Sequence, residues 1–137
     1  MKKYFLLITV ILFSGITFGQ PIKKGTVVGT HVMTVTLQPD VTIDQLIEFF
    51  HNRLAPEIEK NYEGWKVYLV KSLRGENPDS FGLIYVIESE KDRDKFYNPD
   101  GTASELGQAV TEKMQPVMDE FAKIATISTK YDDWLVL

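Results

Sequence analysis

Two segments of the chain carry apolar side chains at the spacing of an amphipathic helix. In the first segment, residues 43–61, the apolar positions are Ile43, Leu46, Ile47, Phe50, Leu54 and Ile58. A helix with one buried stripe gives this pattern, and Thr42 with Gln45 forms a capping box at its start. Pro56 lies inside the pattern, so we expect it to bend the helix or to divide it.

The second helical segment follows Thr102 and Glu105, which form another capping box. Its buried stripe consists of Leu106, Val110, Met114, Val117, Phe121 and Ile124. We expect Pro116 to interrupt this helix as Pro56 interrupts the first.

Three further segments alternate apolar and polar side chains as β-strands do: residues 26–38, 65–73 and 81–88. The Gly- and Pro-containing residues 75–79 join the last two, which predicts an antiparallel hairpin. Residues 89–97 predict a short charged helix, and residues 134–137 a short final strand. The resulting order β-α-β-β-α-β predicts an α+β, ferredoxin-like fold. Both main helices would cover one face of a four-stranded antiparallel sheet, with the first and third strands at its centre.

Both faces of the predicted sheet are apolar. The face expected beneath the helices carries Val27, Met33, Val35, Leu37, Trp65, Val67, Leu69, Phe81, Leu83, Tyr85 and Ile87. The opposite face carries Val28, Val32, Tyr68, Val70, Ile84 and Val86. Two helices cover only one face, and monomers rarely expose an apolar patch of this size. We therefore expect a homodimer that forms through the second sheet face.

Three parts of the chain together resemble the dimeric α/β-barrel superfamily: the capped helix 42–58, the hairpin 65–87 and the ending 131–137. The resemblance implies two ferredoxin-like protomers whose sheets pack into a shared barrel. The superfamily includes antibiotic-biosynthesis monooxygenases that use no cofactor, haem-degrading enzymes, chlorite dismutase-like proteins and small proteins of unassigned role. No motif selects a branch, and the Asn, His and Trp set of the haem-degrading members has no counterpart that can be placed here.

Residues 1–19 have the order of a secretory signal peptide. Lys2 and Lys3 precede a mostly apolar run that ends at the small residue Gly19. The run is shorter than the roughly 20 residues that a membrane anchor needs. We expect an exported protein, periplasmic or extracellular, that consists of one domain at residues 20–137 and has no membrane attachment after signal removal.

Charge and cysteine content narrow the classes of partner and site. The net charge of −4 becomes −6 after removal of Lys2 and Lys3, because residues 1–19 contain no acidic residue. Nucleic acid is therefore not an expected partner. The chain contains 0 Cys, which excludes disulfides and thiolate metal sites. Nucleotide-binding and Ser-His-Asp motifs are missing from the sequence, so we expect no cofactor.

Five residues are candidates for a ligand site. His31 shares the helix-facing side of the first strand, where a neutral imidazole can act as a base or orient a ligand, and it is the one catalytic candidate. A bulge of one residue would move it to the other face. His51 lies at the border of the first helical stripe, where a surface position is the more common outcome. The remaining candidates, Trp65, Tyr68 and Tyr85, suit apolar ligands that need one polar contact, although a core or an interface uses the same residues.

These residues leave three functions open. The first, which we favour, is binding of a small, largely apolar molecule between helices and sheet, with an apolar cavity near His31. The second is a cofactor-independent monooxygenase-like enzyme, which needs His31, Tyr68 or Tyr85 close to one substrate atom. The third is a structural or interaction protein, which predicts a filled core. The histidines have no metal-ligand spacing, so we expect no metal site.

Overall fold

The computed structural model describes residues 22–76 and 80–137, and the expected signal peptide lies outside these residues. The elements follow in the order β1 (Val27–Leu37), α1 (Ile43–Phe49), η1 (Phe50–Leu54), α2 (Ala55–Asn61), β2 (Trp65–Lys71), β3 (Phe81–Ile87), α3 (Glu90–Asp94), α4 (Glu105–Ala122) and β4 (Ala125–Leu135). The strands form one 4-stranded antiparallel sheet in the order β2-β3-β1-β4. This is the predicted ferredoxin-like fold.

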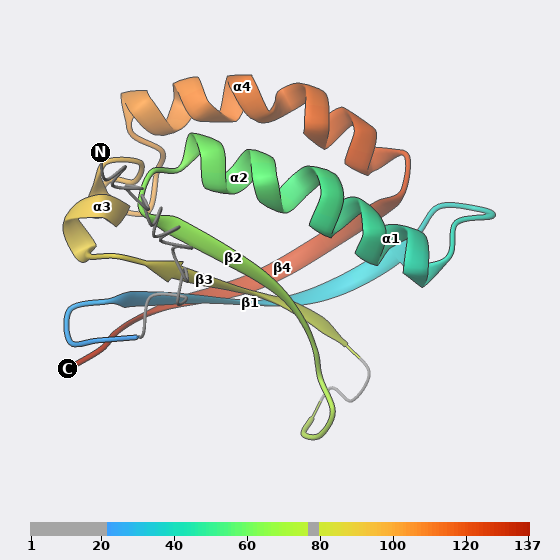
Figure 1. The fold of residues 1–137 in the computed structure, drawn as a ribbon, viewed down its shortest axis with the longest axis horizontal. Helices are drawn as coiled ribbons and strands as arrows, with labels where there is room; N and C mark the ends of the chain where they lie inside the picture. The colour runs from blue at the N-terminus through green and yellow to red at the C-terminus, as the bar shows by residue number, and fades with distance from the viewer. Residues whose placement is uncertain (1–21, 77–79) are drawn as a thin grey trace, which may run out of the picture.

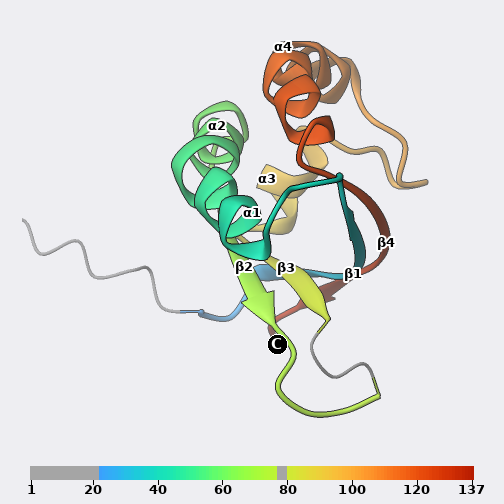
Figure 2. The same ribbon diagram turned by 90° about the vertical axis from the view of Figure 1, so that its right-hand side faces the viewer.

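The helices form a layer over one face of the sheet (Figure 1). Turned by 90°, the molecule shows α1 and α2 above β2 and β3, and α4 on the side of β4 (Figure 2). The other face of the sheet carries no helix. The predicted coverage of a single face is therefore confirmed.

The predicted strand faces are also confirmed. Val27 pairs with Ile87, and Ile87 pairs with Trp65, so one helix-facing row crosses three strands. All three side chains are buried in the core. Because side chains alternate along a strand, the odd-numbered positions of β1 share this face, and His31 is one of them.

The first helical segment divides near Pro56, as predicted. Between α1 and α2, residues Phe50–Leu54 form a π-helical turn, and the Ala55 amide donates to the Phe50 carbonyl. Proline has no amide hydrogen, and its ring crowds the carbonyl four residues earlier. A wider turn directly before Pro56 accommodates the ring, and single π turns of this kind are known in otherwise α-helical segments.

The prediction for the second helical segment is wrong in two respects. Pro116 does not interrupt α4, which is continuous from Glu105 to Ala122. Both Pro116 and Glu112, whose carbonyl loses its partner, lie on the exposed side of α4, where water can hydrate that carbonyl. The N-cap is Ser104, whose hydroxyl accepts from the Gly107 amide at 3.1 Å. Thr102 instead belongs to the preceding turn, where its hydroxyl donates to Asp100.

The final strand is much longer than predicted. It spans Ala125–Leu135 and pairs with β1 along its whole length. Every residue of β4 after Ala125 is exposed, so side-chain burial leaves little pattern in this part of the sequence. Backbone pairing with β1 makes the strand, and a hydrophobic pattern alone does not report such pairing.

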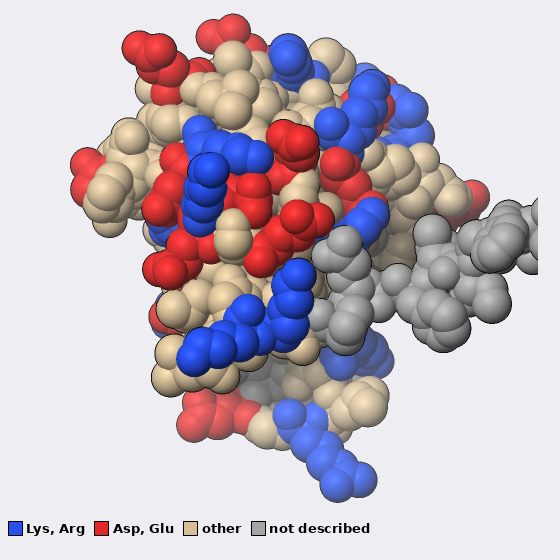
Figure 3. All heavy atoms as spheres, turned by 60° about the vertical axis from the view of Figure 1, so that its left-hand side comes forward, with Lys and Arg blue, Asp and Glu red and all other residues tan. Residues whose placement is uncertain are grey.

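The described surface mixes both signs of charge. The end of the molecule that carries α3 shows carboxylates gathered among lysine and arginine side chains (Figure 3). Acidic residues predominate over the chain as a whole, with a net charge of −4. Within the described residues, none of the helices has the length and apolar character that crossing a bilayer requires.

Candidate ligand cavity between the helices and the sheet

A cavity of about 440 Å³ lies between the helix layer and the sheet. Its roof comes from the helices, through Leu54, Ile58, Met114, Met118 and Phe121. Its floor comes from the sheet, through Gly29, His31, Leu83, Tyr85, Tyr131 and Asp133. Tyr131 is 57% exposed although it lines the cavity. The cavity is therefore open to solvent along β4.

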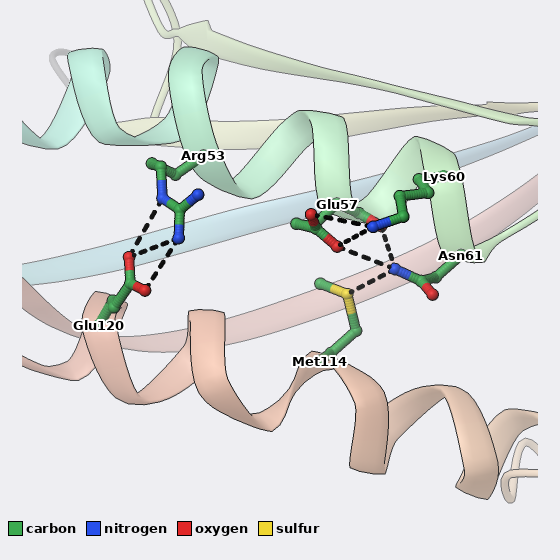
Figure 4. A network of polar contacts seen from close by, with 6 residues as sticks. All are labelled: Arg53, Glu57, Lys60, Asn61, Met114 and Glu120. Atoms are coloured by element: carbon green, nitrogen blue, oxygen red, sulfur yellow. Dashed lines mark hydrogen bonds and ion pairs between the residues drawn. The ribbon is translucent and has the colours of Figure 1, made fainter.

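Polar contacts hold the two halves of the roof together (Figure 4). Arg53 of η1 forms a forked ion pair with Glu120 of α4, with its Nη2 2.9 Å from Oε1 and its Nε 3.2 Å from Oε2. The Asn61 amide of α2 donates to the Met114 sulfur at 3.7 Å. These contacts fix the spacing between the first helical segment and α4, and with it the width of the cavity.

His31 lies on the cavity floor between two tyrosines. Its ring stacks on that of Tyr131, with centroids 5.5 Å apart, and meets the Tyr85 ring edge-on at 5.0 Å. Burial lowers the pKa of His31, while the Asp133 carboxylate acts in the opposite direction more weakly. The imidazole is therefore neutral at pH 7, and one of its nitrogens is available as an acceptor.

Aromatic rings form the wall at the α3 end of the cavity. The Trp65 ring contacts those of Tyr62 at 5.0 Å and Tyr85 at 5.6 Å, and Tyr97 lies 6.1 Å away. Burial raises the pKa of Tyr85 to about 12, so its phenol stays a hydrogen-bond donor at neutral pH. The Trp65 indole nitrogen is buried, and the described residues offer it no acceptor.

One charged pair lies at this end of the cavity. The Arg93 Nε donates to the Asp133 Oδ2 at 2.9 Å, and Arg93 Nη1 reaches Asp94 at 3.4 Å. The Arg93 guanidinium carbon lies 5.8 Å from the Tyr97 ring centroid, which is a cation–π distance. The cavity thus combines a charged pair near α3 with a surface beneath α4 that is mostly apolar but includes Thr111 and Gln115.

Gly29 leaves room on the floor between Tyr85 and Asp133. It pairs with Tyr85 on one side and with Asp133 on the other. A Cβ at Gly29 would lie 3.1 Å from the Asp133 Oδ1 and 3.4 Å from the Tyr85 Cβ. Any side chain at this position would therefore fill the floor next to the carboxylate.

The structure brings three of the five candidate residues together and places two elsewhere. His31, Trp65 and Tyr85 line the cavity. Tyr68 is 50% exposed on the helix-free face, because its even position on β2 alternates with Trp65 and Val67. His51 is exposed on η1, where its ring contacts the Phe50 ring at 5.4 Å.

Arg93 and Asp133 also line the cavity, although neither is among the five candidates from the sequence. The two residues are 40 positions apart, and only the pairing of β4 with β1 brings Asp133 over Gly29. The same parity rule that places His31 also places Asp133, once the full length of β4 is known. The length of β4 is therefore the information that was needed to find Asp133 from the sequence.

Among the described residues, no three or more His, Asp and Glu side chains form a group suited to hold a metal ion. The chemistry available in the cavity consists of aromatic surfaces, a neutral imidazole, phenols and one carboxylate paired with a guanidinium. These groups suit recognition of an organic molecule with one polar end.

Comparison with known proteins assigns no family. No protein-family model matches the chain, and no curated protein does. Among solved structures, the chain is similar to SnoaB, described as a cofactor-independent oxygenase from Streptomyces nogalater, with a TM-score of 0.47 and 12% identity over 82% of this chain and 94% of that chain.

Two further solved structures are described as dimeric, ferredoxin-like proteins of unknown function. The protein from Bacteroides fragilis is 14% identical over 82% of this chain and 98% of that chain, with a TM-score of 0.42. The protein from Thermobifida fusca is 11% identical over 87% of this chain and 100% of that chain, with a TM-score of 0.42. Each of these likenesses is limited to the fold and assigns no family.

Proposed function

We propose that this protein binds a small, largely apolar organic molecule in the cavity between the helices and the sheet. The supporting observation is the cavity itself, whose volume of about 440 Å³ falls in the usual range for small-molecule sites, about 300–1,000 Å³. Apolar and aromatic side chains line most of it, and the charged pair Arg93–Asp133 lies at one end. A pocket-free structural role predicts a filled interior, which these residues do not form.

Calorimetric titration with 1-methylnaphthalene, a rigid apolar probe, tests the binding. We expect saturable binding with one molecule per chain. Ile127→Trp adds an indole to the β4 wall of the cavity, and we expect it to abolish the heat of binding. Glu112→Trp, on the exposed side of α4 and outside the cavity lining, is the matched control. Absence of binding to the wild-type protein would refute the proposed function.

We further propose that the ligand-binding form is a homodimer, with a second copy of the chain on the helix-free face of the sheet. Val32 is 53% exposed, Tyr68 50% and Trp134 60%, and all three lie on this face. Monomers rarely expose apolar surface so continuously. Light scattering should give twice the chain mass, and Val32→Glu should give a monomer. Ala109→Glu, on the exposed side of α4, should leave the mass unchanged.

Export is the remaining part of the proposal. It is supported by the basic and then apolar order of residues 1–19. Mass spectrometry of the product from a secreting host should show a new N-terminus near Gln20. Retention of the full sequence in the cytoplasm would refute export without affecting the cavity.

Cofactor-independent catalysis is the second candidate function. The observation that favours it is the neutral His31 imidazole, which faces the cavity and contacts Tyr85. Such a group can accept a proton from a bound carbon acid. We would incubate the protein with 2-acetylnaphthalene in D₂O and follow deuterium exchange of the acetyl protons. Exchange that is lost in His31→Ala and kept in His51→Ala would support catalysis, and an uncatalysed rate would exclude proton abstraction from this probe.

A further inference from the structure

The two ends of the cavity differ in chemistry, and the end with the charged pair has an unused acceptor. Asp133 uses its Oδ2 to accept from Arg93 Nε at 2.9 Å. Its Oδ1 leans over Gly29, 3.1 Å from the point that a Cβ would occupy there. The described residues donate no hydrogen bond to this second oxygen. A bound donor group above Gly29 would therefore find a carboxylate acceptor ready for it.

The charge balance at this end favours a cation as the donor. The single guanidinium of Arg93 is shared by two carboxylates, those of Asp133 and Asp94, at 2.9 and 3.4 Å. The neutral His31 adds no positive charge. Asp94 lies outside the cavity lining, and its ion pair with Arg93 reduces the positive charge that Arg93 presents to the cavity. A cation above Gly29 therefore meets the Asp133 carboxylate and a guanidinium that two acids already engage. The net charge of −4 on the chain also attracts cations at long range.

Aromatic side chains line the cavity beside this position and also favour a cation. Tyr85 pairs with Gly29 across the sheet, and Tyr131 stacks on His31. Aromatic rings attract cations through their negative faces, and most strongly where water is excluded. This end of the cavity already holds one cation in this way, since the Arg93 guanidinium lies 5.8 Å from the Tyr97 ring centroid.

We propose that this end of the cavity binds the protonated primary amine of an amphiphilic amine. One N–H donates to the Asp133 Oδ1, the ammonium group lies against the tyrosine rings, and the apolar body of the ligand occupies the space beneath Met114 and Phe121. This inference rests on the proposed binding function and names its ligand class. A carboxylate with surrounding aromatic rings distinguishes an amine from a neutral molecule of the same shape through both charge and hydrogen bonding.

A set of naphthalene probes with different heads tests the inference. 1-Naphthylmethylamine carries an ammonium group, 1-naphthalenemethanol a neutral donor, 1-methylnaphthalene no polar head and 1-naphthoate an anion. Calorimetry at pH 7 and low salt should rank the amine first, by about tenfold or more over the methyl compound, since a hydrogen bond to a charged group contributes at least this much. The naphthoate should bind most weakly.

Two neighbouring aspartates provide a matched pair of variants. Asp133→Asn removes the negative charge and should reduce the preference for the amine over 1-methylnaphthalene, measured as the ratio of the two affinities in the same variant. Asp132→Asn, on the opposite face of β4, should leave the amine preference intact. Gly29→Ala keeps the Arg93–Asp133 pair but fills the floor beneath Oδ1, so it should also reduce the amine preference. Circular dichroism would verify that each variant is folded.

The possible outcomes separate this inference from the function on which it rests. Binding of 1-methylnaphthalene with no preference for the amine would overturn the amine site and leave the cavity function standing. Equal affinity for the alcohol and the amine would reduce the site to a general donor site and overturn the cation claim. If the naphthoate bound most tightly, this end of the cavity would bind anions through Arg93 instead. Failure of all four probes to bind would overturn the proposed function itself.

Discussion

Gly107 offers a sharp test of how closely α4 approaches the segment after α3. It is buried at the third position of α4, and a Cβ there would lie 2.1 Å from the Phe96 carbonyl oxygen. Carbon and carbonyl oxygen atoms in close contact stay about 3.3 Å apart. Gly107→Ala therefore requires a backbone shift on the order of 1 Å. The Phe96 carbonyl also accepts from the Ser104 amide at 3.0 Å, and Phe96 itself is 2% exposed.

The magnitude follows from opposing contributions to the free energy of unfolding. Alanine in a helix interior is favoured over glycine by about 1 kcal/mol. Overpacking costs about 1–3 kcal/mol, and loss of the Ser104–Phe96 hydrogen bond costs about 1 kcal/mol more. We expect Gly107→Ala to destabilise the protein by a net ~1–3 kcal/mol, because the clash outweighs the gain in helix propensity.

Urea unfolding followed by circular dichroism measures this difference as a lower midpoint at an unchanged slope. Glu112→Ala, at an exposed position of the same helix, is the control and should change stability by no more than about 0.5 kcal/mol. A Gly107→Ala protein that is more stable than wild type would show that α4 and Phe96 do not approach as closely as described. The expected clash between a Cβ at residue 107 and the Phe96 carbonyl oxygen would then be absent.

Three further predictions concern titration and the helix layer. Burial lowers the folded-state pKa of His31 below its usual 6.5, so the folded protein binds fewer protons there than the unfolded chain does. Stability should therefore decrease as pH falls through 6.5 to that lower pKa. Urea titrations at several pH values should show a smaller decrease for His31→Gln than for His51→Gln. Because the pKa of Tyr85 is raised from 10.0 to about 12, stability should decrease as pH rises between these values, and less so in Tyr85→Phe; equal slopes would contradict the burial of this phenol. Arg53→Ala removes an ion pair whose side chains are 52% and 43% exposed, so the free energy of unfolding should fall by less than about 1 kcal/mol. A fall of more than about 2 kcal/mol would mean that the pair is far better shielded from water.

The element order and the strand faces could be predicted because their signals are local. Period-two alternation placed Trp65 and Ile87 on the core face, and three-to-four spacing placed Leu54 and Phe121 on buried helix stripes. His31 followed from the parity of β1. These predictions require only that apolar side chains be removed from water together.

The extent of β4 could not be predicted in this way, because its side chains are exposed on both faces. Its stability derives from backbone pairing with β1 over the whole length from Ala125 to Leu135. The helix caps show a similar limit, since Thr102 and Ser104 are both good caps and the turn at Asp100 decides between them. In each case a hydrogen-bonding contact that the hydrophobic pattern does not report determined the outcome.

Asp132 and Asp133 show how this limit affects the site. The sequence treats them alike, as two adjacent carboxylates in an acidic segment. In the structure, Asp133 pairs across the sheet with Gly29 and lines the cavity, while Asp132 pairs with Thr30 and faces the other side. The two residues have the same side-chain chemistry and differ in role because they lie on opposite faces of β4. These faces can be assigned only when β4 is known to begin at Ala125. This contrast makes the two asparagine variants a discriminating pair, because substitution chemistry, sequence neighbourhood and strand are the same, whereas of the two only Asp133 lines the cavity and pairs with Arg93.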